Sequence, residues 1–255
     1  DGVGVKSIGG KLQASIDDIN ISANGDIEYD QVVAQKNLNI ESKTGDVVQG
    51  YSAYVGNDIN IKAKERLNIN GGYFYAKNNI DLESIDGDID LAKTSESEYS
   101  FINAGNLNLT SGKNINIDDS SVIIGYSYDE NGNLADYGDG VLKASANGDI
   151  NVDNSQLISK TNTLKTDYDV NVNDSYIEAR DSLTQTAKNI NYNQVTIENS
   201  GDVIAKASNS INIQETNINS NSLAADSTEN FISDKSKIIT SNGDISISAE
   251  TIENK

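Results

Sequence analysis

The segment NDINIKA (residues 57–63) contains an apolar–asparagine–apolar phrase that returns along most of the chain. Alternation of apolar and polar side chains with a period of two is typical of a β-strand with one buried face. Matching phrases begin at Ile19, Leu38, Ile59, Leu67, Ile80, Ile89, Leu107, Ile115, Ile150, Val170, Ile190, Ile211 and Ile245. The sequence therefore predicts many short strands of one kind.

The spacing of these phrases is nearly constant. From Ile19 to Leu38 is 19 residues and from Leu38 to Ile59 is 21, while Ile150 and Val170 are 20 apart. A fixed period of about 20 residues is typical of a solenoid. Equivalent positions one coil apart favour parallel stacking over the hairpins of a sandwich or barrel. We predict an all-β, right-handed parallel β-helix with about 20 residues per coil, about a dozen coils and a length of roughly 60 Å.

The strands are separated by turns rich in glycine, aspartate and asparagine. Gly-Asp pairs follow short polar residues at 24–26, 44–46, 86–88, 147–149 and 242–244. Glycine at such corners adopts backbone angles that β-branched residues avoid. Asparagines at the same place in successive coils are expected to form side-chain hydrogen-bond ladders along the axis.

We expect residues 1–255 to be a single β-helix segment of a longer protein, with one excursion at residues 125–140. That segment reads GYSYDENGNLADYGDG and has the turn chemistry of a loop or hairpin leaving the rod. Insertions on a solenoid project from one face, which is often the binding face. The alternative is a surface loop without a role, because loop length costs little free energy.

The same excursion raises the hypothesis of a Ca²⁺ site. Asp129, Asn131 and Asn133 alternate as oxygen ligands do in the first half of an EF-hand loop. The match ends there, because glycine falls at the fourth place and no glutamate stands at the twelfth. Apart from this Ca²⁺ hypothesis, we expect no cofactor.

Aromatic residues recur about one coil apart in the N-terminal half. They form either an internal stack or an exposed strip that holds a sugar or a partner surface. Neighbours on a strand face opposite sides, so an inward Phe74 would place Tyr73 and Tyr75 outside. The candidate binding residues are Tyr73, Tyr75, Tyr126, Tyr128 and Tyr137.

Composition excludes several function classes. Acidic residues number 39 against 19 basic ones, giving a formal net charge of -20 that disfavours nucleic-acid binding. The chain has no His or Cys, and its two arginines, Arg66 and Arg180, are nearly six coils apart. A β-helical polysaccharide lyase would need clustered carboxylates with a base or arginine. We therefore expect no enzymatic activity, and no membrane insertion because no apolar run is long enough.

The phrases at residues 57–63, 107–111 and 112–117 resemble filamentous-haemagglutinin repeats, a similarity that covers nearly the whole chain except residues 125–140. The resemblance implies a large exoprotein, exported by an outer-membrane transporter in the two-partner secretion style. Family members include adhesins, haemolysins and the stalks of contact-dependent growth inhibition proteins. The chain shows neither the secretion-domain motif nor a C-terminal toxin signature, so both are expected outside residues 1–255.

From this resemblance we expect a stalk or adhesin segment at the bacterial cell surface, a monomeric rod that acts as a rigid spacer. Its expected partner is a receptor or glycan on a host or neighbouring cell. An alternative is the receptor-binding module of a contact-dependent toxin-delivery protein, which would use the 125–140 loop and the tyrosines.

Overall fold

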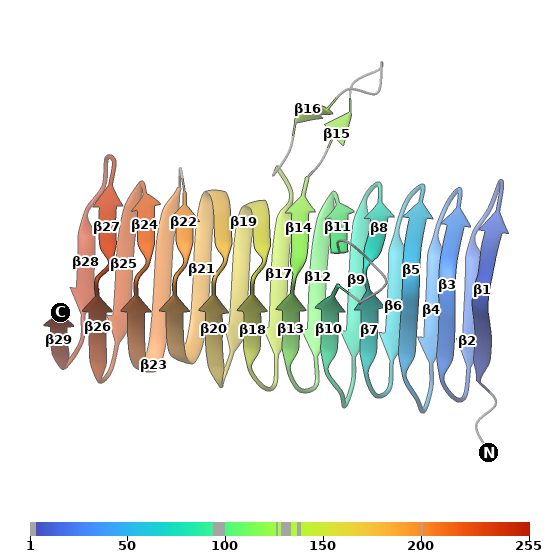
Figure 1. Cartoon of the computed structure of the whole chain (residues 1–255), viewed down its shortest axis with the longest axis horizontal. Coiled ribbons are helices and arrows are strands. Elements are labelled where there is room, and N and C mark those ends of the chain that lie inside the picture. Colours follow the sequence, from blue (N-terminus) through green and yellow to red (C-terminus); the bar gives the residue numbers. More distant parts are fainter. Residues whose placement is uncertain (1–3, 94–99, 126, 129–133, 137–138, 200) are drawn as a thin grey trace.

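The computed structural model describes residues 4–93, 100–125, 127–128, 134–136, 139–199 and 201–255. They form a rod of parallel strands that winds through about 11 turns of roughly 21 residues, with the termini at opposite ends (Figure 1). The described residues contain strands and turns but no helix, and hence no helix that could cross a membrane. The predicted all-β parallel β-helix is confirmed.

Each turn contributes strand segments to three faces, and each segment pairs in parallel with its counterparts in the turns before and after. Face A contains β2 (Ile19–Ala23), β4 (Leu38–Ser42), β6 (Ile59–Ala63), β9 (Asn79–Ser84), β12 (Asn106–Ser111), β17 (Val141–Ala146), β25 (Ser222–Ser227) and β28 (Ile245–Ser248). Face B contains β7 (Leu67–Asn70), β10 (Ile89–Ala92), β13 (Ile115–Asp118), β18 (Ile150–Asp153), β20 (Asp169–Asn173), β26 (Asn230–Asp234) and β29 (Thr251–Asn254). Face C contains β8 (Gly72–Ala76), β11 (Ser100–Ala104), β14 (Ser120–Ile124), β22 (Thr196–Glu198), β24 (Asn217–Ser220) and β27 (Lys237–Thr240).

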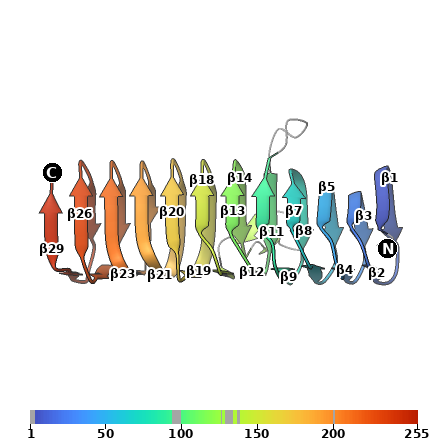
Figure 2. The same ribbon diagram turned by 90° about the horizontal axis from the view of Figure 1, so that it is seen from below.

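Six longer strands bend around corners and serve more than one face. Faces B and C share β1 (Val5–Ala14), β3 (Ile27–Ala34) and β5 (Val47–Val55). Faces C and A share β19 (Gln156–Thr166), faces A and B share β23 (Asp202–Gln214), and β21 (Tyr176–Asn193) serves all three. The view in Figure 2 shows successive turns side by side in one row.

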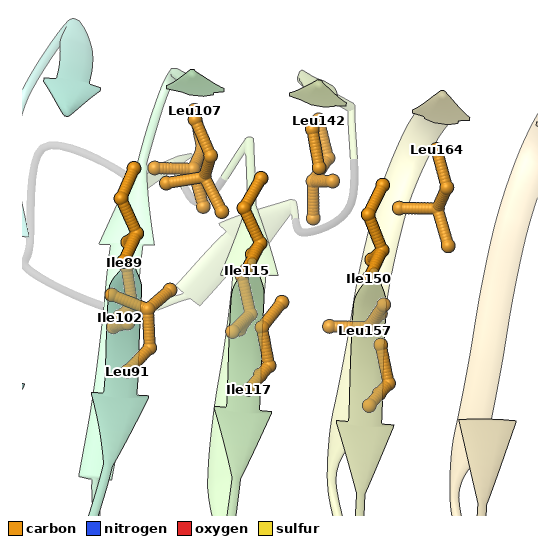
Figure 3. Close-up of a cluster of buried hydrophobic side chains, with 14 of the residues drawn as sticks. Ile89, Leu91, Ile102, Leu107, Ile115, Ile117, Leu142, Ile150, Leu157 and Leu164 are labelled. Atoms are coloured by element: carbon orange, nitrogen blue, oxygen red, sulfur yellow. The ribbon is translucent and has the colours of Figure 1, made fainter. Parts of the chain in front are cut away.

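The core is a thin apolar column inside the three faces. In face B, Ile89, Ile115 and Ile150 are paired in register on successive turns, and all three are fully buried (Figure 3). Burying one such side chain stabilises the fold by about 1.5–3 kcal/mol. Because the same residue types repeat at the same places, each turn covers the apolar atoms of its neighbours and the rod is stabilised turn by turn.

Asparagines form the ladders that the sequence predicts. On the outside of face B, Asn151 donates to Asn116 at 2.9 Å, and Asn171 donates to Asn151 at 3.0 Å. The ladder continues with Asn191 donating to Asn171 and Asn212 to Asn191, each at 2.8 Å. Each Nδ2 donates to Oδ1 of the preceding turn, so the chain of bonds has one direction along the rod.

The Gly-Asp corners carry similar contacts between turns. The carboxylate of Asp26 accepts the backbone N–H of Asp46 at 3.0 Å, and Asp149 accepts that of Asp169 at the same distance. The short aspartate side chain next to the turn glycine thus accepts a hydrogen bond from a backbone N–H of the next coil. Backbone N–H groups at strand ends need such a partner because the strand ladder does not supply one.

Two inward positions of face A differ from the apolar pattern. Asn162 and Gln185 are both fully buried, at places that Leu142 and Ala144 hold one and two turns earlier. The phenol of Tyr192 donates to Oε1 of Gln185. Among the described residues, the amide of Asn162 has no hydrogen-bond partner. The turns that contain Asn162 and Gln185 therefore each have a polar side chain within the core.

Between β14 and β17 the chain leaves the rod. β15 (Ser127–Tyr128) pairs antiparallel with β16 (Leu134–Asp136), and Figure 1 shows this hairpin projecting from the end of β14. The hairpin starts at Gly125, whose φ of 90° belongs to the left-handed region, and whose neighbour in space is Gly140. These two glycines thus allow the chain to leave the rod and return to it at the same place.

Candidate binding surfaces

Aromatic side chains line the outside of face C near the N-terminal end of the rod. The rings of Tyr54 and Tyr73 stack with centroids 5.8 Å apart at 10°, and Phe101 lies 4.7 Å from Tyr73 at 36°. We call the set Tyr51, Tyr54, Tyr73, Tyr75 and Phe101 the aromatic strip. Tyr51 and Tyr54 are 50% and 46% exposed, so the strip offers apolar ring surface to a ligand.

Strand alternation decides which aromatics are outside. Phe74 is fully buried, and its neighbours Tyr73 and Tyr75 are only partly buried on the outer side of β8. Both tyrosines therefore lie outside the core, and their role in binding stays a prediction. Gly72, which opens β8, has a φ of +70° and an added Cβ would lie 1.8 Å from the carbonyl oxygen of Tyr51. This close approach lets β8 begin directly beneath β5.

The other candidate residues belong to the excursion. Tyr128 is in β15, but its side chain lies outside the described part of the structure. Tyr126, Tyr137, Asp129, Asn131 and Asn133 lie outside the described residues, so the binding and Ca²⁺ hypotheses for them stay predictions. Within the described part of the chain, no three Asp or Glu residues come together in a way that could hold a metal ion.

A groove on the outside of face A was not anticipated. It crosses β2, β4, β6, β9 and β12 and has a volume of about 570 Å³. One row of outward side chains is mainly amides, and the second is charged or hydroxylic. The amide row is Asn20, Asn39, Asn60, Asp81 and Asn108, and the second row is Ser22, Glu41, Lys62, Glu83 and Thr110. The repeated phrase places these residues outside but says nothing about the shape of the surface.

A second hollow, of about 580 Å³, lies at the corner between faces B and C. Asp119, Asn154, Asp174 and Gln194 line it, and each has a positive φ between 44° and 55°. Burial raises the pKa of Asp118, beside this corner, and the carboxylates of Asp119 and Asp153 raise it further. Lys93 also lines this hollow and lies 3.6 Å from Asp119 in an ion pair.

Face C also brings together acids that are far apart in the sequence. The hydroxyl of Tyr176 lies 3.1 Å from Glu178 and 3.2 Å from Glu198, and Nε of Arg180 lies 3.6 Å from Glu178. Burial raises the pKa of Tyr176, and the charge of Glu178 adds to the effect. In the sequence, Arg180 is far from Arg66 and this cluster was not anticipated, because the pairing of β21 with β22 brings Glu198 beside Glu178 only in the folded chain.

Comparison of the chain with protein-family models, curated proteins and solved structures finds no match. The fold class rests on the pairing of the strands, and the candidate surfaces rest on geometry. The chain is a parallel β-solenoid with an exposed aromatic strip on face C and a groove on face A between two rows of polar side chains.

Proposed function

We propose that this chain is a rigid stalk segment of a large bacterial surface protein. The observation that carries the proposal is the unbroken parallel pairing of the rod, in which every face continues from the first turns to the last. A body held by hydrogen bonds along its axis on three sides resists bending and shortening. Such a rod separates whatever it carries at one end from whatever anchors the other.

The repeat phrases support a place outside the cell, by their resemblance to filamentous-haemagglutinin repeats. Export by an outer-membrane transporter and exposure at the cell surface belong to the same proposal. The net charge of -20 supports a hydrated surface that attracts neither nucleic acid nor anionic lipid. The proposed role is mechanical and adhesive rather than enzymatic.

Rigidity is tested by a distance measurement along one face. The chain has no cysteine, so Glu41→Cys and Asp226→Cys carry the only two spin labels. These positions lie in one column of face A, eight strand steps apart along the registers from β4 to β25. We expect one narrow distribution near about 38 Å. A broad distribution or several maxima would show that the rod bends, and the stalk role would fail.

The aromatic strip favours a second role, an attachment surface for a receptor or glycan on another cell. Exposed, pre-stacked rings can pack against sugar rings or apolar side chains at little entropic cost. Flow cytometry of cells exposed to the labelled protein would compare the parent chain with the double variant Tyr54→Ser, Tyr73→Ser and with deletion of Gly125–Gly140. Loss of binding only in the double variant assigns attachment to the strip, and loss only in the deletion assigns it to the excursion. Equal binding by all three chains excludes both surfaces.

A further inference from the structure

The groove on face A has features of a ligand site that the stalk role does not require. Its two rows run along the rod axis over five successive turns. Neighbouring side chains in a row are one strand spacing apart, about 4.8 Å. The groove therefore presents the same kind of polar group at regular intervals to any long ligand that lies along it.

The amide row is only partly saturated by its own ladder. Asn39 donates to Oδ1 of Asn20 at 2.8 Å, and Asn60 donates to Oδ1 of Asn39 at 2.9 Å. A carboxamide has two N–H donors and two acceptor lone pairs, and a ladder bond on each side uses one of each. Each asparagine in the row thus keeps at least one donor and one acceptor for a ligand.

The ladder is broken at the centre of the groove. Asp81 accepts from Nδ2 of Asn108 at 2.6 Å, but its carboxylate has no N–H to give to the preceding turn. No described residue donates to Oδ1 of Asn60, whose register partner is Asp81. Two acceptors, the Asn60 carbonyl and the Asp81 carboxylate, therefore lie side by side and are open to a donor from outside.

Charge and spacing narrow the class of ligand. The groove contains Glu41, Asp81 and Glu83 against one cation, Lys62, which lies 2.9 Å from Glu83 in an ion pair. This excess of negative charge disfavours an anionic ligand. An extended peptide repeats about every 3.3 Å and falls out of step with groups about 4.8 Å apart. A chain of sugar rings has a longer repeat, and its hydroxyls both donate and accept.

We propose that the groove formed by β2, β4, β6, β9 and β12 binds an uncharged linear glycan along the rod axis. One sugar hydroxyl donates a hydrogen bond to the acceptor pair of Asn60 and Asp81, and the asparagines on either side contact the neighbouring sugars. The proposal concerns a different face from the aromatic strip, so neither depends on the other.

Asp81→Asn is the decisive variant. The new amide donates to Oδ1 of Asn60 and still accepts from Asn108, so the ladder closes and the acceptor pair disappears without a change of shape. Asp90→Asn is the matched control, since Asp90 interrupts the face B ladder in the same way, accepting from Asn116 at 2.6 Å. The control changes charge by the same amount on a face that does not line the groove.

Binding is measured by calorimetry with hexasaccharides of β-1,4-, α-1,4- and β-1,3-linked glucose, with oligogalacturonate as the anionic probe and a lysine-rich peptide as the cationic one. We expect at least one neutral hexasaccharide to bind, Asp81→Asn to weaken it about tenfold or more, and both Asp90→Asn and the variant Tyr54→Ser, Tyr73→Ser to bind as the parent does. Absence of neutral-glycan binding overturns the proposal. So does equal affinity in Asp81→Asn, a loss in the strip variant alone, or preference for either charged probe.

Discussion

Nδ2 of Asn171 donates a hydrogen bond to Oδ1 of Asn151 at 3.0 Å, although the two residues are 20 positions apart in the chain. Oδ1 of Asn171 accepts in turn from Asn191 at 2.8 Å. One side chain thus joins three turns of the rod. The ladder makes the stability of each turn depend on its neighbours, which is the basis of the cooperative folding expected of a solenoid.

Asn171→Ala should destabilise the rod, because it leaves both the acceptor of Asn151 and the donor of Asn191 without their ladder partner. We expect a loss of about 1–2 kcal/mol, measured by urea denaturation followed by circular dichroism. Asn219→Ala, on the exposed side of β24 and outside the ladders, is the control and should change little. Equal losses in the two variants would contradict a structural role for the ladder.

Asp90→Asn should stabilise the rod. Oδ1 of Asn68 is buried without a hydrogen-bond partner, and its register partner Asp90 has no proton to donate. The new amide would donate to Asn68 and continue to accept from Asn116, for a gain of about 1 kcal/mol. Asp90→Ala removes the acceptor as well and should lower the stability. If the asparagine variant unfolds at the same or a lower urea concentration than the parent, the unpaired carbonyl of Asn68 does not lower the stability of the rod.

Val195→Thr should restore a hydroxyl ladder that valine interrupts. At this corner, Ser155 accepts the N–H of Ser120 at 3.0 Å, and Thr216 accepts that of Val195 at 3.2 Å. Ser175 holds the same position and accepts the N–H of Ser155 at 3.0 Å. A threonine at position 195 would accept the N–H of Ser175, so the variant should be as stable as the parent or more so.

The control for Val195 is Val172→Thr, which places the same hydroxyl at a fully buried apolar position of face B. A hydroxyl without a partner there should cost about 1–3 kcal/mol in urea denaturation. Comparable losses of stability in both threonine variants would show that a hydroxyl at position 195 does not form the hydrogen bond expected with Ser175.

Two aspartates should give opposite responses to pH. The pKa of Asp118 is raised above its ordinary value of 3.8 by burial and by Asp119 and Asp153, so its charge opposes folding at neutral pH. The pKa of Asp202 is lowered by hydrogen bonds from Ser222 and Asn221, so its charge supports folding. The contribution of Asp118 is therefore most favourable below pH 3.8, and that of Asp202 above it.

Asp118→Asn should accordingly raise the urea midpoint at pH 7, and Asp202→Asn should lower it. Both differences from the parent should shrink as the pH approaches 3.5, since the parent carboxyl of Asp118 becomes protonated and that of Asp202 begins to lose its charge. Urea titrations at pH 7, 5 and 3.5 measure this. Differences that stay constant over this range would exclude ionisation as their cause.

The strands could be predicted because their signals are local and repeat. An apolar–asparagine–apolar phrase such as residues 59–61 buries its two isoleucines in any half-covered strand, and the period of about 20 aligns them. The outward direction of Tyr73 and Tyr75 followed from the same alternation once Phe74 was inside. The polar core residues Asn162 and Gln185 could not be predicted, because they lie in the face A segments of β19 and β21, which carry no such phrase.

The period, the parallel stacking and the identity of the ladder residues could all be derived from the sequence, because each depends on the order of apolar and polar side chains along the chain. Tertiary structure alone decided the shape of the outer surface. The depth of a groove depends on how neighbouring strands and their side chains are placed in space. The groove on face A and the open acceptors of Asn60 and Asp81 can therefore be recognised only in the folded rod. The contact of Tyr176 with Glu198 likewise depends on strand pairing between turns, which brings residues 22 positions apart within hydrogen-bonding distance.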